Sequence, residues 1–147
     1  MPIKEIDIPP FLLRERSYNI VKCHYTQEGD PSLQMVPMPG LDSPVIHAPS
    51  MRYVLSYPFA SKRYYSTMAE NGRFFTKKEV IDGLRRDFRH MFRNSASPTQ
   101  TGVRESKRYY VPIHSVCVYR CLYDEDKRLL VVEADGTPVL YDPSLPF

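Results

Sequence analysis

The chain has 147 residues, of which 42% are hydrophobic and 25% charged, and its formal net charge is +3 at pH 7. This length and balance predict one globular domain over residues 1–147 and exclude wholesale disorder. No apolar run approaches the roughly 18 residues of a membrane-spanning helix, and the N-terminus lacks a signal-peptide pattern, so no membrane partner is expected.

The cysteines are Cys23, Cys117 and Cys121, and they are widely dispersed. An odd and scattered set predicts reduced thiols instead of a disulfide framework. We therefore expect an intracellular location, cytoplasmic or nuclear, with the interior of a virion as a further setting.

The first 50 residues predict extended structure. Residues 1–16 read as an extended arm, because Pro9-Pro10 disfavours a helix and the apolar run after it suits docking on a neighbouring surface. Residues 17–26 are rich in β-branched and aromatic side chains and predict a strand. Residues 31–50 contain five prolines. They predict a long Pro-rich loop, interrupted at most by a short strand near residues 45–47.

A predicted core follows over residues 51–142. Residues 51–57 alternate large apolar side chains with other types, which is typical of a strand, and residues 64–68 predict a second strand. The Asn71-Gly72 pair predicts a turn that leads into a helix.

Residues 76–94 predict the principal helix of the fold. Thr76 can act as its N-cap, and Glu79, three residues later, completes a capping box. Apolar side chains then recur at helical spacing and predict a buried stripe that consists of Val80, Ile81, Leu84, Phe88, Met91 and Phe92.

Positive charge is concentrated around this helix. Residues 51–108 contain 13 Lys and Arg against 5 Asp and Glu. Arg85, Arg89 and Arg93 follow one another at intervals of four and predict a basic ridge, with Arg86 beside it. Such a concentration suits nucleic acid or an acidic protein partner.

The C-terminal third predicts a β-meander. Strands are expected over residues 113–123 and 129–134, and Asp135-Gly136 predicts a tight hairpin that returns over residues 137–141. Together with the helix this indicates an α+β fold, in which one principal amphipathic helix packs on an antiparallel β-sheet.

The pentapeptide Ser-Lys-Arg-Tyr-Tyr occurs twice, at residues 61–65 and 106–110. Its basic side chains would contact phosphates while the tyrosines stack on bases of RNA or DNA. The alternative is an amphipathic strand whose basic pair is simply solvated. The candidate contacts to nucleic acid or an acidic partner are Lys62, Arg63, Tyr64, Tyr65, Arg85, Arg86, Arg89, Arg93, Lys107, Arg108, Tyr109 and Tyr110.

Motifs of known catalytic chemistry are missing: there is no nucleophile elbow, phosphate-binding glycine loop or metalloprotease signature. His114, Cys117 and Cys121 are close in sequence, but on one strand His114 would point away from both cysteines. We therefore predict no enzymatic activity, no metal, no cofactor and no small-molecule substrate, with a Cys/His dyad formed in space as the alternative.

The leading hypothesis is a non-catalytic structural or interaction protein, a small subunit of a larger assembly such as a capsid-type shell or a ribonucleoprotein. Its predicted protein interface lies at the apolar ends of the chain, at Phe11, Leu12, Leu13, Leu145 and Phe147. The alternative is a nucleic-acid-binding domain that uses the basic, Tyr-rich middle region. The first hypothesis expects exposed apolar patches, and the second expects one continuous basic and aromatic surface.

Overall fold

The computed structural model of the chain describes the backbone of residues 3–25, 31–59, 62–94, 100–104, 107–137 and 139–140. Side chains are described for residues 3–22, 34–59, 62–94 and 111–137.

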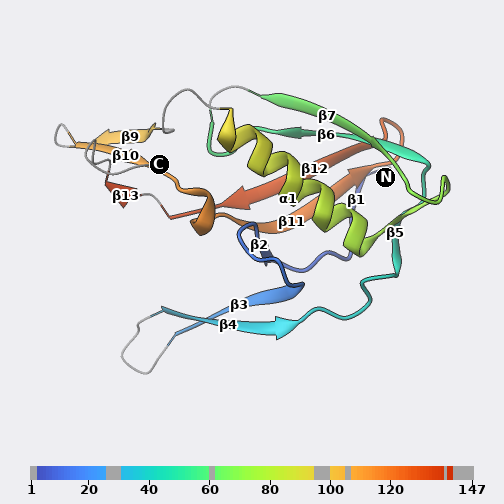
Figure 1. The fold of residues 1–147 in the computed structure, drawn as a ribbon, viewed down its shortest axis with the longest axis horizontal. Helices are drawn as coiled ribbons and strands as arrows, with labels where there is room; N and C mark the ends of the chain where they lie inside the picture. The colour runs from blue at the N-terminus through green and yellow to red at the C-terminus, as the bar shows by residue number, and fades with distance from the viewer. Residues whose placement is uncertain are drawn as a thin grey trace.

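A six-stranded main sheet organises the described part of the chain (Figure 1). Its spatial order is β1 (Ile3–Glu5), β11 (Cys117–Asp124), β12 (Leu129–Asp135), β6 (Ser50–Leu55) and β7 (Arg63–Met68), and β2 (Phe11–Leu12) pairs with β11 as well. The pairs are antiparallel except β12 with β6, which is parallel. The sheet is therefore largely antiparallel, as the sequence predicted, with one parallel pair.

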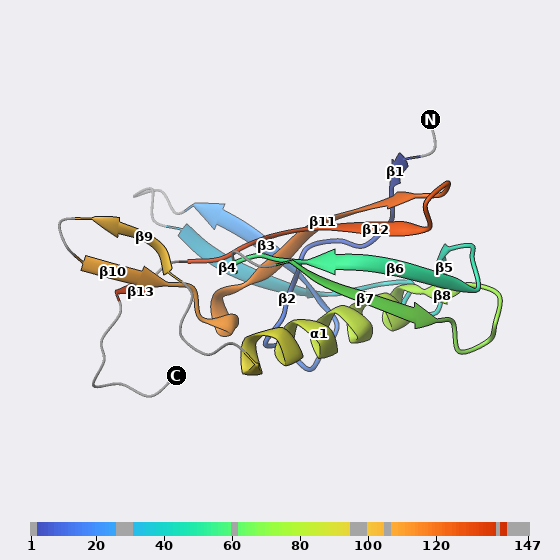
Figure 2. The same ribbon diagram turned by 90° about the horizontal axis from the view of Figure 1, so that it is seen from above.

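Helix α1 (Lys77–Arg93) covers one face of this sheet (Figures 1 and 2). Thr76 and Glu79 form the predicted capping box. The amides of Lys77 and Lys78 donate to the carbonyl oxygens of Ser43 and Leu41, at 3.0 and 2.9 Å, so the preceding loop satisfies two further donors of the first turn. The helix thus begins where the sequence predicted.

The predicted apolar stripe of α1 is confirmed as the helix side of the core. Val80, Ile81, Leu84, Phe88 and Met91 are at most 1% exposed, and Phe92 is half-buried. Phe59 packs edge-on against Phe92 with ring centroids 4.8 Å apart. These contacts confirm the α+β class.

Smaller elements surround the main sheet. Strands β3 (Asn19–Tyr25) and β4 (Pro31–Pro37) form a hairpin, and β5 (Pro44–Ile46) pairs with β8 (Phe75–Thr76). A three-stranded sheet has the order β13 (Val139–Leu140), β10 (Lys107–Tyr110) and β9 (Gln100–Arg104). A 3-10 turn, η1 (Ile113–Ser115), precedes β11.

The N-terminal segment is not a separate arm. Phe11 and Leu12 pair with Val118 and Cys117 of β11, and the Leu13 amide donates to the Val116 carbonyl at 3.1 Å. Phe11, Leu12 and Leu13 are 0, 6 and 0% exposed. The expectation that residues 1–16 dock on another molecule is therefore wrong for this apolar run, and the core is not confined to residues 51–142.

Two further predictions are corrected by long-range pairing. Residues 31–37 form β4 instead of a loop, because β3 supplies a complete antiparallel partner. The segment after Gly136 does not fold back on β12, because β13 pairs with β10.

Candidate functional site

Arg85, predicted to be part of an exposed ridge, is a buried residue of the core. It is 4% exposed, and its Nε and Nη2 donate to the Leu12 carbonyl oxygen at 3.2 and 3.0 Å. Its guanidinium lies over the rings of Phe11 and Tyr18, 5.4 and 5.6 Å from their centroids. Burial lowers the pKa of this guanidinium. Arg85 therefore positions the N-terminal segment and is not available to a partner.

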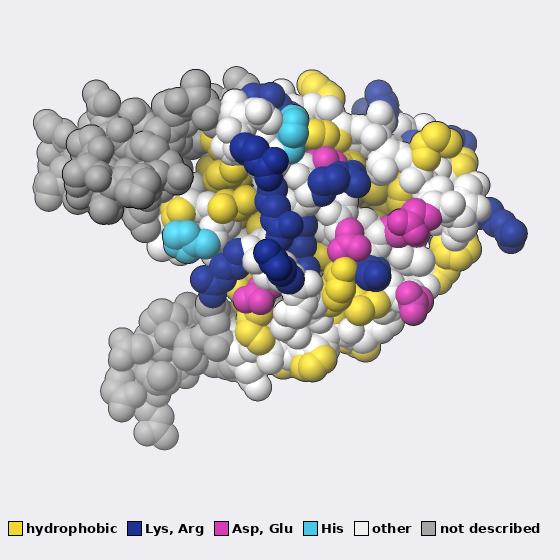
Figure 3. Space-filling view, viewed as in Figure 1, with side chains coloured by type: hydrophobic (Ala, Val, Ile, Leu, Met, Phe, Trp, Pro, Cys, Tyr) yellow, Lys and Arg dark blue, Asp and Glu magenta, His cyan; other side chains and the backbone are white. Residues whose placement is uncertain are grey.

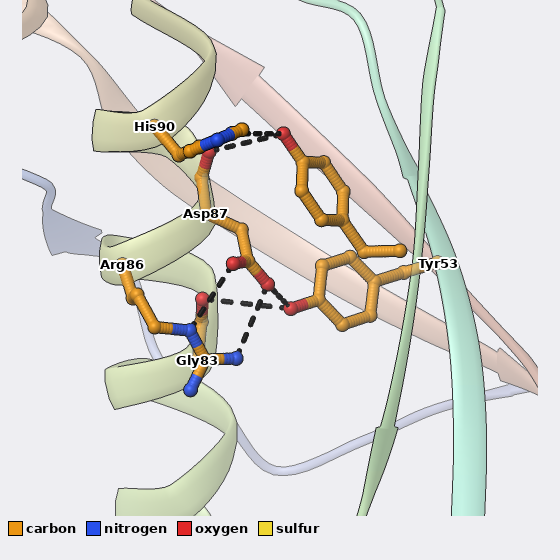
Figure 4. A network of polar contacts seen from close by, with 6 residues as sticks. Tyr53, Gly83, Arg86, Asp87 and His90 are labelled. Atoms are coloured by element: carbon orange, nitrogen blue, oxygen red, sulfur yellow. Dashed lines mark hydrogen bonds and ion pairs between the residues drawn. The ribbon is translucent and has the colours of Figure 1, made fainter. Parts of the chain in front are cut away.

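Arg86 takes part in a polar network between α1 and the main sheet (Figure 4). Its Nε and Nη2 donate to the Asp87 carboxylate at 3.1 and 3.3 Å, and the buried Tyr53 hydroxyl donates to Oδ2 of the same carboxylate. Burial, followed by this hydrogen bond, raises the pKa of Tyr53, and the hydrogen bond to Asp87 raises the pKa of Arg86. Because donors from both elements occupy the Asp87 carboxylate, the network fastens α1 to β6.

The second tyrosine of this network comes from β7. The Tyr65 hydroxyl lies 3.4 Å from the Asp87 carbonyl oxygen and 3.5 Å from His90 Nδ1. Its ring stacks on Tyr53 with centroids 5.7 Å apart. Tyr65 therefore points toward the helix, and it is not an exposed stacking platform.

A second tyrosine–carboxylate contact fixes the other side of the helix. The Tyr18 hydroxyl donates to Asp82 Oδ1 at 2.7 Å, and Lys78 Nζ lies 5.9 Å from the centre of the Tyr18 ring. Burial, with a smaller contribution from Asp82, raises the pKa of Tyr18 to about 12. Sequence analysis missed both tyrosine–carboxylate pairs, since their partners lie far apart in the chain.

The exposed basic residues of α1 form what we call the helix-side surface: Lys78, Arg86, Arg89, His90 and Arg93. Figure 3 shows a band of Lys and Arg side chains crossing the molecule on the side of the helix. Arg89 and Arg93 make no ion pair with a carboxylate of the described residues. Of the predicted basic ridge, Arg89 and Arg93 are therefore exposed, whereas Arg85 is buried.

The two Ser-Lys-Arg-Tyr-Tyr copies lie in different sheets. In the first, Lys62 and Tyr64 are exposed, Arg63 and Tyr65 are half-buried, and residues 63–65 belong to β7 of the main sheet. The second copy contributes β10 of the three-stranded sheet. The side chains of Lys107, Arg108, Tyr109 and Tyr110 lie outside the described set.

The face of the main sheet opposite α1, which we call the open sheet face, carries apolar side chains. Register places Leu122, Val131, Val54 and Tyr64 in one row across β11, β12, β6 and β7. Tyr53 and Tyr65 contact α1, so their neighbours Val54 and Tyr64 point away from it. Tyr64 is 76% exposed, and Val131 is 38% exposed.

Exposed large apolar residues among the described side chains all lie on main-sheet strands: Ile3, Tyr64, Met68, Tyr119 and Val131. The strand alternation puts Met68 on the same face as Tyr64. A hollow of about 560 Å³ adjoins the apolar row and is lined by Arg52, Val54, Tyr64, Tyr65, Ser66 and Leu129. The open sheet face therefore combines exposed apolar surface with a depression.

Charges on the open sheet face are largely satisfied within the chain. Arg120 donates to both carboxylate oxygens of Glu133, at 3.1 and 2.7 Å. Arg52 Nη2 donates to the Lys127 carbonyl oxygen at 3.2 Å. This face consequently differs from the helix-side surface, where Arg89 and Arg93 are unpaired within the described residues.

Cys117 and Cys121 of β11 do not lie on the same face, although a regular strand would put them there. A register shift between Val118 and Arg120 interrupts the strand alternation, and Cys121 is 0% exposed whereas Cys117 is half-buried. Burial raises the pKa of Cys117 to about 11 and that of Cys121 to about 12. Within the described residues, His, Cys, Asp and Glu side chains form no group of three suited to a metal ion.

The residues that were predicted to form a protein interface fall into two groups in the structure. Phe11, Leu12 and Leu13 belong to the core, and Leu145 and Phe147 lie outside the described residues. The open sheet face was missed as a site, because the alternation in residues 51–57 separated Val54 from Tyr53 and Leu55 but no face was predicted for Tyr64.

Comparison with known proteins finds no family model that matches the chain, and no similar curated protein or solved structure. Helix α1 is too short to cross a lipid bilayer, and the described residues contain no other helix that would do so.

Proposed function

We propose that the protein is a non-catalytic interaction protein, a small subunit of a larger protein assembly that binds a neighbouring subunit through its open sheet face. The observation that carries this proposal is the placement of the exposed large apolar residues on main-sheet strands. A sheet normally buries its apolar side chains against another layer. Here α1 supplies that layer on one face, while Tyr64 and Met68, on the other, remain 76 and 73% exposed.

The chemistry of this face favours a protein occupant over nucleic acid. Tyrosine and methionine are enriched in protein interfaces, and an exposed apolar patch marks such a site. Arg120 of this face is paired with the Glu133 carboxylate, and Arg52 is held by the Lys127 carbonyl oxygen, so the face offers fewer free cations to phosphates than the helix-side surface does.

The surroundings of the Asp87 carboxylate and of the two β11 thiols support a non-catalytic role. The Asp87 carboxylate is occupied by Tyr53 and Arg86, and burial raises the thiol pKa values of Cys117 and Cys121, which opposes thiolate formation at neutral pH. These groups stabilise the fold and are poorly suited to proton transfer or nucleophilic attack.

The test is purification of the tagged full chain from its native cells, with mass determination by light scattering. We expect a protein partner, a second copy included, in fixed stoichiometry. The Tyr64→Ser/Val131→Thr variant should no longer co-purify with this partner, whereas the Arg89→Gln/Arg93→Gln variant should still do so. Both variants change exposed residues and should retain the wild-type unfolding midpoint. A partner held equally by both variants, or a wild-type chain that purifies alone, would contradict the proposal.

A further inference from the structure

We propose that the helix-side surface binds the phosphate backbone of nucleic acid without reading its sequence, with Arg89 and Arg93 as principal contacts. This activity lies on the opposite side of the molecule from the open sheet face, and it does not depend on the proposed subunit role. The argument rests on which helix charges are neutralised inside the chain and which are not.

The three carboxylates of α1 are turned toward other partners, and that of Glu79 belongs to the capping box at the start of the helix. Asp82 accepts a hydrogen bond from the Tyr18 hydroxyl, and Asp87 is held by Tyr53 and Arg86. Neither carboxylate pairs with Arg89 or Arg93. These two arginines lie one helical turn apart, about 6 Å along the axis, so their guanidinium groups can contact neighbouring phosphates.

Neighbouring basic side chains extend the same surface. The Arg86 side chain is 64% exposed, and the Asp87 carboxylate fixes its position at the sheet-facing edge of the helix. His90 and Lys78 are exposed as well. An arginine held in place loses less side-chain entropy when a phosphate binds, since part of that cost was incurred on folding.

The composition of the helix-side surface distinguishes a phosphate backbone from an acidic protein. Protein interfaces draw their affinity from a few buried aromatic or apolar anchors. None of the large exposed apolar residues within the described side chains lies on α1, so the helix itself offers no exposed anchor of this kind. Binding to a phosphate backbone needs none, because it is driven by counterion release.

Among the described residues, neither tyrosine of the first pentapeptide copy is available for base stacking on this surface, which is why the proposed recognition is independent of sequence. Tyr64 points away from the helix, and Tyr65 is hydrogen-bonded against it. The Tyr18 ring, which does lie beside α1, is contacted by Lys78 and Arg85. The basic and aromatic side chains of the first pentapeptide copy therefore do not act together here.

The experiment is fluorescence anisotropy of a labelled single-stranded RNA of about 20 uridines, titrated with the full chain over a range of salt concentrations. We expect Arg89→Gln/Arg93→Gln to weaken binding by about tenfold or more at low salt, and to lower the slope of log affinity against log salt by about 1.4. The matched control, Arg73→Gln/Lys127→Gln, removes the same charge from exposed positions elsewhere and should change the slope little.

Three results would overturn the proposal: no RNA binding at low salt, equal weakening in the control variant, or competition by polyglutamate as effective per charge as by unlabelled RNA. The Tyr64→Ser/Val131→Thr variant should bind RNA like the wild type. The outcome of the RNA measurement is therefore independent of whether the open sheet face binds a protein partner.

Discussion

Arg85 donates two hydrogen bonds to the carbonyl oxygen of Leu12, so the central helix holds the N-terminal segment directly against the core. A carbonyl oxygen can accept from two donors, and the guanidinium fork supplies both at once. The same guanidinium covers the faces of Phe11 and Tyr18. One side chain therefore joins residues of β2, the following connection and α1.

The first prediction concerns this contact. Arg85→Met removes both hydrogen bonds and leaves the Leu12 carbonyl oxygen without its donors, which should lower the free energy of unfolding by about 1–3 kcal/mol. Urea unfolding followed by circular dichroism measures the change. Arg89→Met, on the exposed side of the helix, is the matched control and should stay within about 0.5 kcal/mol of wild type. Equal effects of the two substitutions would show that Arg85 is not structural.

The second prediction concerns truncation. Deleting residues 1–13 removes two strands that pair with β11 and five buried apolar side chains, so we expect loss of the cooperative unfolding transition. The milder Leu13→Ala should remain folded and cost about 2–5 kcal/mol. A truncated protein with a wild-type melting curve would restore the view of this segment as a detachable arm.

The third prediction concerns alkaline pH. Burial and the Asp82 hydrogen bond raise the pKa of Tyr18 from 10.0 to about 12, so the fold favours the neutral phenol. The stabilisation from Tyr18 is therefore complete below pH 10 and is lost as the pH rises through about 12. The difference in unfolding free energy between wild type and Tyr18→Phe should shrink over this interval. A difference that stays constant from pH 9 to 12 would refute the assignment.

The fourth prediction concerns the thiols of β11. Burial raises the pKa of Cys121 to about 12 and removes its side chain from solvent, so little thiolate is accessible at pH 8. Iodoacetamide should label Cys121 in denaturant and leave it unmodified in the folded protein, as read by peptide mass mapping. Rapid labelling of folded Cys121 would indicate that β11 opens readily.

Local signals predicted the helix, and non-local pairing accounts for most of the errors. The Thr76–Glu79 capping box and the apolar stripe lie within one segment, so their outcome depends little on the rest of the chain. The pairing of Phe11 with Val118 depends on a strand near the opposite end of the sequence. No pattern within residues 1–16 separates a strand of this sheet from an arm that binds another protein.

The candidate site was predictable only in part for a related reason. The spacing of Arg85, Arg89 and Arg93 predicted one exposed ridge, but Arg85 is buried, and periodicity does not tell that it meets a carbonyl oxygen of another segment. The strand alternation separates Val54 from Tyr53, yet only the register across β6, β7 and β12 places Tyr64 and Val131 beside Val54 and reveals an apolar row.

The pairing of β1 and β2 with β11 also dictates an order of events at the ribosome. The apolar Phe11, Leu12 and Leu13 are synthesised well before β11, the strand that covers them. Until then this segment is an exposed hydrophobic stretch, of the kind that chaperones bind and that promotes aggregation. Ribosome-bound chains that end before Cys117 should therefore remain sensitive to protease at their N-terminal segment, and protection should begin only once β11 has left the exit tunnel.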